Sequence, residues 1–114
     1  MYDVTVSKLM IAKKQPDLLK LEAAAGEAGK LLKVLSNPDR LLLLCQMTQG
    51  EFSVRELEVM TGITQPTLSQ QLTVLRDEHL VSTRRDGKKI FYNIVSNEAL
   101  AVLQVLYQLY CPED

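Results

Sequence analysis

Two thiols, Cys45 and Cys111, are the most reactive side chains in the sequence, and no third cysteine accompanies them. Thiolates attack other sulfur compounds and are ligands for soft metals. Two cysteines are too few for the disulfide framework of a small secreted domain. In a reducing compartment such a pair is more often free, metal-binding or redox-sensing than structural. Taken singly, Cys45 is better explained as a buried small hydrophobe and Cys111 as a thiol at a frayed helix end.

A second set of candidate residues lies on a predicted helix over 64–78, whose first part, 64–74, carries no charge. Glutamine can form two hydrogen bonds to adenine, and serine and threonine can reach either bases or phosphates. An ordinary solvated helix face usually carries Lys and Glu, so the absence of charge favours DNA reading over that plainer interpretation. The predicted DNA-binding residues of this segment are Thr64, Gln65, Thr67, Ser69, Gln70 and Thr73.

Four cations surround the Asp86-Gly87 dipeptide, which separates two runs of alternating residues. This arrangement predicts a β-hairpin. Its cations can contact DNA phosphates or enter the minor groove. Charge also protects an exposed edge hairpin from aggregation, and both roles can hold together. The predicted DNA-binding cations are Arg84, Arg85, Lys88 and Lys89.

Capping signals divide the rest of the chain into helices. Ser53 and Glu56 form a capping box, and Gly62 suits the left-handed residue that closes a helix. We predict that Leu57 and Met60 are buried, that Leu68, Leu72 and Leu75 form an inner stripe, and that Ile90, Tyr92 and Ile94 share a strand face against the core. The predicted helices and their caps are 18–35 (Asp17), 38–49 (Asn37), 54–61 (Ser53), 64–78 (Thr64) and 97–111 (Ser96 or Asn97).

This order of elements predicts a mainly α, winged helix-turn-helix domain with a β-hairpin wing, flanked by N- and C-terminal dimerisation helices. The last helix is apolar nearly all round and must be covered on two sides. Its own core covers one side, and a second copy of the chain is expected to cover the other. Residues 1–16 show no clear period and are predicted to be a mobile or loosely docked extension, with 17–114 forming the domain.

The composition is that of a globular protein: 114 residues, 46% of them hydrophobic and 24% charged. No apolar run approaches the ~20 residues that span a bilayer, and no secretion signal precedes the domain, so we expect a cytoplasmic protein without a membrane partner. The net charge is −1, but residues 64–93 hold five basic and three acidic side chains. A local basic face still attracts phosphate, because salt screens charges beyond ~10 Å.

Three segments resemble the ArsR/SmtB repressors: LLKVLSNPDRLLLL, then FSVRELEVMTGITQPTLSQQLTVLRDEHLV, then GKKIFYNI. The resemblance covers about 31–111 and implies a homodimeric repressor that binds inverted-repeat operator DNA and releases it when an inducer binds. Many members sense metals, but this chain has Phe52-Ser53-Val54 where the arsenic and cadmium sensors have Cys-x-Cys. It also lacks the His and carboxylate ligands of the last helix, and its one histidine, His79, is expected to play a surface or packing role.

Cys45 and Cys111 instead match the two-cysteine, sulfide- and redox-responsive BigR-type subgroup. The resemblance implies that reactive sulfur species or an oxidant link the two thiols and release DNA, with no cofactor and no metal. The competing interpretations are a metal-responsive repressor that uses the two cysteines with further ligands, and a small thiol oxidoreductase. An enzyme is disfavoured because the sequence has no Cys-x-x-Cys, no thioredoxin-like pattern and no clustered acid and base.

Overall fold

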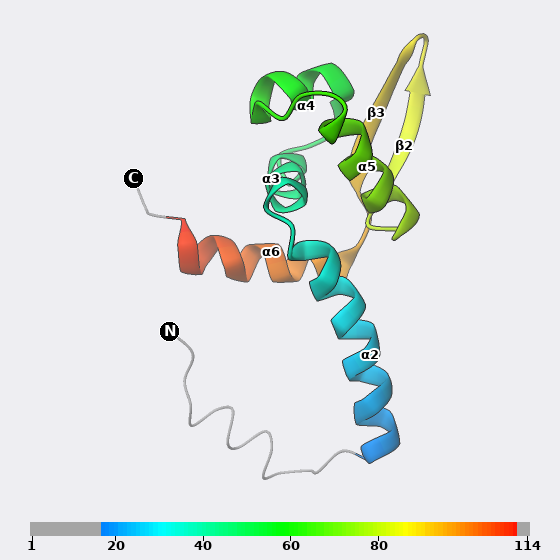
Figure 1. Ribbon diagram of the computed structural model, residues 1–114, viewed down its shortest axis with the longest axis vertical. Coiled ribbons are helices and arrows are strands. Elements are labelled where there is room, and N and C mark those ends of the chain that lie inside the picture. The colour runs from blue at the N-terminus through cyan, green and yellow to red at the C-terminus, as the bar shows by residue number, and fades with distance from the viewer. Residues whose placement is uncertain (1–16, 112–114) are drawn as a thin grey trace. The chain divides into compact units, whose positions relative to one another are not determined.

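The computed structural model describes residues 17–111, so the predicted extension over 1–16 lies outside the described residues. The elements, in chain order, are α2 (Leu18–Leu35), α3 (Pro38–Met47), β1 (Phe52–Ser53), α4 (Val54–Thr61), α5 (Thr67–Asp77), β2 (Val81–Asp86), β3 (Lys89–Ile94) and α6 (Asn97–Tyr110) (Figure 1). Most of α2 forms a unit of its own, which ends at Leu31, and Leu32–Asp114 forms the second unit. The second unit has the predicted order of helix, turn, helix and hairpin.

Leucines of α3, α4 and α5 form the centre of the second unit. Helix α3 lies between α4 and α6, with α5 beside it (Figure 1). The predicted inner stripe of α5 and the burial of Leu57 are confirmed. Truncating one such leucine to alanine typically costs about 2–5 kcal/mol, so this core fixes α5 firmly. The fully buried side chains are Leu43, Leu44, Leu57, Leu68, Leu72 and Leu75.

Two predicted core residues are exposed. Met60 is 48% exposed and Ile90 is 41% exposed. Ile90 pairs with Arg85 near the tip of the hairpin, and that end of the hairpin extends beyond the helices (Figure 1). The prediction for Met60 was wrong because its side chain lines the open pocket beside the wing and does not enter the core. The prediction for Ile90 was wrong because the outer half of the wing has no helix to pack against, whereas Val81 at its base is buried.

The predicted helix caps are confirmed at most positions. The Ser53 N–H donates to Glu56 Oε1 at 2.9 Å, and the Glu56 N–H donates to Ser53 Oγ at 3.2 Å, which completes the capping box. Gly62 closes α4 with φ of 76°. Asn37 caps α3 by accepting from the Arg40 N–H at 3.0 Å, and Ser96 caps α6. Each such cap typically stabilises a helix by about 1 kcal/mol.

Thr64 is not the cap of α5, which begins at Thr67. A residue before proline is disfavoured in the helical conformation, so the helix begins only after Gln65-Pro66. The Gln65 side chain takes over the capping role, because its Oε1 accepts from the Ser69 N–H at 3.0 Å. The prediction that a helix covers 64–78 was therefore wrong at its start.

The three strands form one antiparallel sheet in the order β1-β3-β2. The hairpin pairs Val81 with Ile94 at its base and Asp86 with Lys89 at its tip, and Gly87 turns the chain with φ of 63°. This confirms the hairpin predicted around Asp86-Gly87. Strand β1 pairs Phe52 with Tyr92, so the residues that lead into α4 are joined to the wing.

Helix α5 ends in a Schellman motif with a non-glycine residue in the left-handed position. The Leu80 N–H donates to the Leu75 carbonyl and the His79 N–H to the Arg76 carbonyl, each at 3.0 Å, while His79 itself has φ of 62°. Glycine is the usual residue there because a Cβ is strained in this conformation. The exposed His79 therefore carries backbone strain at the end of α5.

We predict that His79→Gly raises the free energy of unfolding by about 0.5–1 kcal/mol, because relief of Cβ strain exceeds the entropy lost by glycine. Urea denaturation measures the change. The matched control is His79→Ala, which keeps the Cβ and should bring no gain. Equal effects of the two substitutions would show that strain at this position is negligible.

Candidate DNA interface and thiol pocket

Helix α5 presents the polar residues predicted to read DNA. Ser69, Gln70 and Thr73 are exposed, Thr67 is half-buried, and Thr64 and Gln65 are exposed in the turn before the helix. Two of these side chains already have intramolecular partners, since Gln65 caps the helix and Thr73 Oγ1 donates to the Ser69 carbonyl at 2.8 Å. Within 17–111, the Gln70 amide makes no hydrogen bond, so its donors and acceptor are free for a base edge.

Arg40 positions α5, and sequence reasoning missed it. Its Nε donates to the Val34 carbonyl at 2.7 Å and its Nη2 to the Lys33 carbonyl at 3.3 Å, so it satisfies carbonyls at the end of α2. Its Nη1 donates to Gln71 Oε1 at 2.9 Å, on α5. One guanidinium therefore links the end of α2, the start of α3 and the middle of α5. The signal in the sequence was an arginine directly after the break at 36–38, where the last carbonyls of the preceding helix need donors.

Arg84, one of the four predicted wing cations, is held within the protein. It lies over the ring of Phe91, its cross-strand partner on β3, at 4.7 Å from the ring centroid. Beyond that ring, its Nε and Nη2 both approach Glu51 Oε1 at 2.8 Å. Sequence reasoning also missed Glu51, because its partner is 33 residues away. The contact holds the middle of the wing and leaves Arg84 less free for DNA than its neighbours.

The remaining wing cations surround the tip of the hairpin. Arg85 Nε donates to the Gly87 carbonyl at 3.2 Å and so supports the turn. Lys88 and Lys89 are exposed, and neither forms an ion pair within the described part of the chain. The two lysines are therefore the wing cations most available to phosphate.

Both thiols line one open pocket of about 630 Å³. Cys45 comes from α3 and Cys111 follows the last residue of α6, and both are free and exposed. Partial burial, and next the nearby Cys111, raise the pKa of the Cys45 thiol. The structure thus brings together the two cysteines that the sequence paired. The other lining residues are Thr48, Gln49, Leu103, Gln104, Tyr107 and Gln108.

The described residues contain neither a candidate metal site nor a candidate membrane-spanning helix. Between residues 17 and 111, no three His, Cys, Asp or Glu side chains come together as a metal site requires. None of the helices in that range combines the length and apolar content needed to cross a bilayer. His79 stands alone at the end of α5.

The fold and its polar surfaces define a winged helix-turn-helix DNA-binding regulator, and the comparisons with known proteins specify the family. The model for "bacterial regulatory protein, arsR family" matches residues 37–83. A biofilm growth-associated repressor of Agrobacterium fabrum is 50% identical over 95 residues, which cover 82% of this chain and 81% of that protein. The chain belongs to the ArsR family of bacterial transcriptional regulators.

Two solved structures agree with this assignment. The crystal structure of the transcriptional repressor BigR from Xylella fastidiosa matches with a TM-score of 0.79 at 47% identity, covering 86% of this chain and all 100% of that one. The solution structure of a homodimeric winged helix-turn-helix DNA-binding domain from Mycobacterium bovis, a possible ArsR-family regulator, matches with a TM-score of 0.68 at 27% identity, covering 83% and 86% of the two chains. The predicted fold and the resemblance to BigR are confirmed.

We predict that Gln70→Ala and Lys88→Ala weaken DNA binding in different ways. Gln70→Ala should cost about 1–3 kcal/mol on the operator and little on other sequences, because a bidentate base contact is lost. Lys88→Ala should weaken all duplexes alike and flatten the salt dependence by about one unit, because a phosphate contact is lost. Binding titrations on operator and scrambled duplexes over a salt series separate the two. Equal losses on all duplexes for both variants would show that α5 does not read bases.

Proposed function

We propose that this protein is a homodimeric, cytoplasmic repressor that binds an inverted-repeat operator and releases it when Cys45 and Cys111 are bridged. Reactive sulfur species, or another thiol oxidant, would be the inducer. The observation that carries the proposal is that the only two cysteines of the chain line a single pocket between α3 and α6. Neither cysteine belongs to the DNA-facing residues of α5 or the wing.

Dimerisation is supported by the apolar face that α6 leaves exposed. Tyr107 and Tyr110 are 63% and 79% exposed, and Leu109 beside them is also exposed. On α2, Leu18, Leu19 and Leu21 are exposed as well. The homodimeric relative from Mycobacterium bovis has the same fold. Two copies would present two α5 helices to half-sites about one DNA turn, or ~34 Å, apart.

The bridging chemistry follows from the state of the two thiols. A thiolate attacks the terminal sulfur of a polysulfide donor, becomes a persulfide, and expels the shortened donor as a thiolate. The second thiolate then attacks the inner sulfur of that persulfide, hydrosulfide leaves, and a disulfide remains. If the donor transfers a longer sulfur chain, the bridge is a polysulfide. Because its pKa is raised, Cys45 forms the attacking thiolate less readily, so Cys111 is assigned the first attack.

Release of DNA requires that the bridge change the presentation of α5. Cys45 follows the buried pair Leu43 and Leu44, which belong to the core that holds α5. Cys111 ends α6, the helix with the exposed dimer face. A bridge between them would shift α6 against α3 and so alter the spacing of the two α5 helices. The coupling energy needed is modest, typically about 1–3 kcal/mol.

We predict that Cys45→Ser and Cys111→Ser each bind the operator like the reduced wild type but resist release by a polysulfide donor, because one thiol cannot form the bridge. The assay is operator binding before and after the donor, with reversal by a reductant as the control. Release of either single variant as readily as wild type would refute the two-thiol switch. Release by zinc or cadmium in place of the donor would favour a metal sensor, and multiple-turnover thiol oxidation would favour an oxidoreductase.

We predict a dimer of about 26 kDa at micromolar concentration, twice the 12.8 kDa of one chain, because the exposed face of α6 needs a cover. Sedimentation equilibrium measures this mass directly. Tyr110→Glu should weaken the dimer, because it would place a charge on the face that is proposed to be buried. The exposed Lys88→Glu, in the turn of the wing and outside α2 and α6, is the matched control. A wild-type protein that stays monomeric at this concentration would contradict the proposal.

A further inference from the structure

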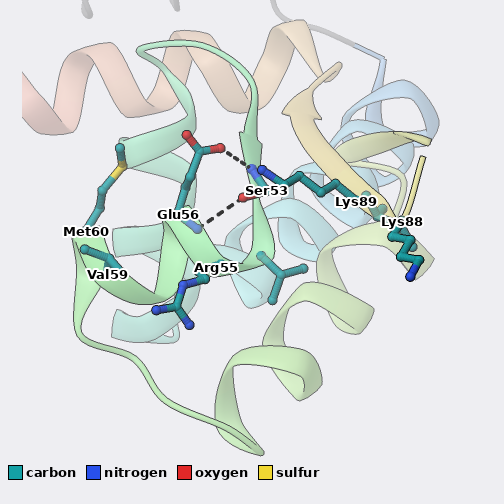
Figure 2. A pocket seen from close by; sticks show the side chains of 9 residues that line it. Ser53, Arg55, Glu56, Val59, Met60, Lys88 and Lys89 are labelled. Atoms are coloured by element: carbon teal, nitrogen blue, oxygen red, sulfur yellow. Dashed lines mark hydrogen bonds between the residues drawn. The ribbon is translucent and has the colours of Figure 1, made fainter. Parts of the chain in front are cut away.

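A second open pocket, also of about 630 Å³, lies between α4 and the wing, and we call it the α4–wing groove (Figure 2). Its floor is apolar and includes Val59, which is 72% exposed, and Met60. Its cations come from both sides: Arg55 from α4, and Lys88 and Lys89 from the wing (Figure 2). The remaining lining residues are Ser53, Val54, Glu56 and Ile90.

The charge of this groove is positive, although the whole chain has a net charge of −1. Glu56 is the one carboxylate in the lining, and it is engaged by the Ser53 N–H in the capping box (Figure 2). The hydrogen bonds from Ser53, and next the charge of Lys89, lower the pKa of Glu56. Across residues 17–111, no carboxylate lies within ion-pair distance of Arg55, Lys88 or Lys89. These three cations are therefore not neutralised by the protein itself, in contrast to Arg84.

The position of Arg55 is itself unfavourable to the fold. It is the second residue of α4, where the partial positive charge of the helix terminus repels a cation. The side chain is exposed and, in the described chain, makes no hydrogen bond that would offset this repulsion. An external anion held between Arg55 and the wing lysines would offset it.

The mixture of cations and apolar side chains in the lining fits the sugar-phosphate backbone of DNA. Phosphates match the cations, and the apolar faces of deoxyribose match Val59, Met60 and Ile90. The groove is continuous with the wing, whose Lys88 and Lys89 belong to both surfaces. We propose that the α4–wing groove holds one backbone strand of the bound DNA, with Arg55 as a phosphate-binding residue. The proposal rests on DNA binding by this fold and is independent of the thiol switch.

The test is Arg55→Gln in the full-length reduced protein, with binding to operator and scrambled duplexes measured by fluorescence anisotropy over a salt series. We expect a loss of roughly fivefold on both duplexes and a salt dependence flatter by about one unit, because one phosphate contact is removed. Arg55→Lys should keep the salt dependence, because it keeps the charge. The thermal midpoint of Arg55→Gln should stay equal or rise, which excludes misfolding as the cause.

The matched control is Lys20→Gln, which removes an exposed cation of α2, outside α5, the wing and the groove. Its salt dependence should equal that of wild type. If the control variant flattened the salt dependence of DNA binding as much as Arg55→Gln, net charge alone would explain the effect. The proposed phosphate contact of Arg55 would then be refuted. An unchanged salt dependence in Arg55→Gln would also overturn it, and would leave the groove for an acidic protein segment. A flatter salt dependence in Lys88→Ala but not in Arg55→Gln would refute the role of the groove. It would still support DNA binding by the wing.

Discussion

The packing of α3 against α4 and α5 is the constraint on which the rest of this structure depends. Leu43 and Leu44 lose all exposure there, together with leucines of both partner helices. A core this small has no second layer, so a shift of α3 is transmitted to α5 and not absorbed. Arg40 adds a polar restraint to the same junction through Gln71. Helix α5, which we predict to read DNA, is therefore held by apolar contacts on one side and by the Arg40 guanidinium through Gln71.

Helix α3 also connects the core to the thiols, since Cys45 directly follows the buried Leu44. Cys45 is exposed in the pocket, whereas Leu43 and Leu44 are buried in the core. The exposed strip of α6 lies on the other side of that pocket, with Tyr107 contributing both to the pocket lining and to the exposed apolar face. In the proposed function, a chemical change at Cys45 and Cys111 would act on α3, which packs against α5, and on α6, which carries the proposed dimer contact.

Local signals predicted most of the fold, and non-local contacts account for what was missed. The caps at Asn37, Ser53 and Ser96 lie within three residues of their partners, so the sequence displays both members of each contact. The start of α5 was misplaced because Gln65 is an unusual cap that competed with Thr64. The burial of Met60 and Ile90 was mispredicted because helical spacing and strand alternation show which residues share a face, but do not show whether another element covers that face.

Non-local contacts also determine which cations of the candidate site are free to bind DNA, and the sequence does not show these contacts. The sequence placed four cations around the wing but could not distinguish them. Arg84 is paired with Glu51, 33 residues away, and its guanidinium also lies over the ring of Phe91. Arg55 was passed over because a lone arginine on a short helix looks like ordinary surface charge. Only the pairing of β1 with β3 brings the start of α4 beside the wing, and with it Arg55 beside the two lysines.

These charges also suggest how a protein with a net charge of −1 would hold DNA and, in the proposed function, release it. A few unpaired cations give an affinity that depends steeply on how many of them reach phosphate at once. Two half-sites double that number only when both α5 helices and both wings are in register with the duplex. A change of spacing between protomers would therefore remove several phosphate contacts together. A coupling of about 1–3 kcal/mol, which is roughly 5- to 150-fold in affinity, is sufficient for such a switch without unfolding either protomer.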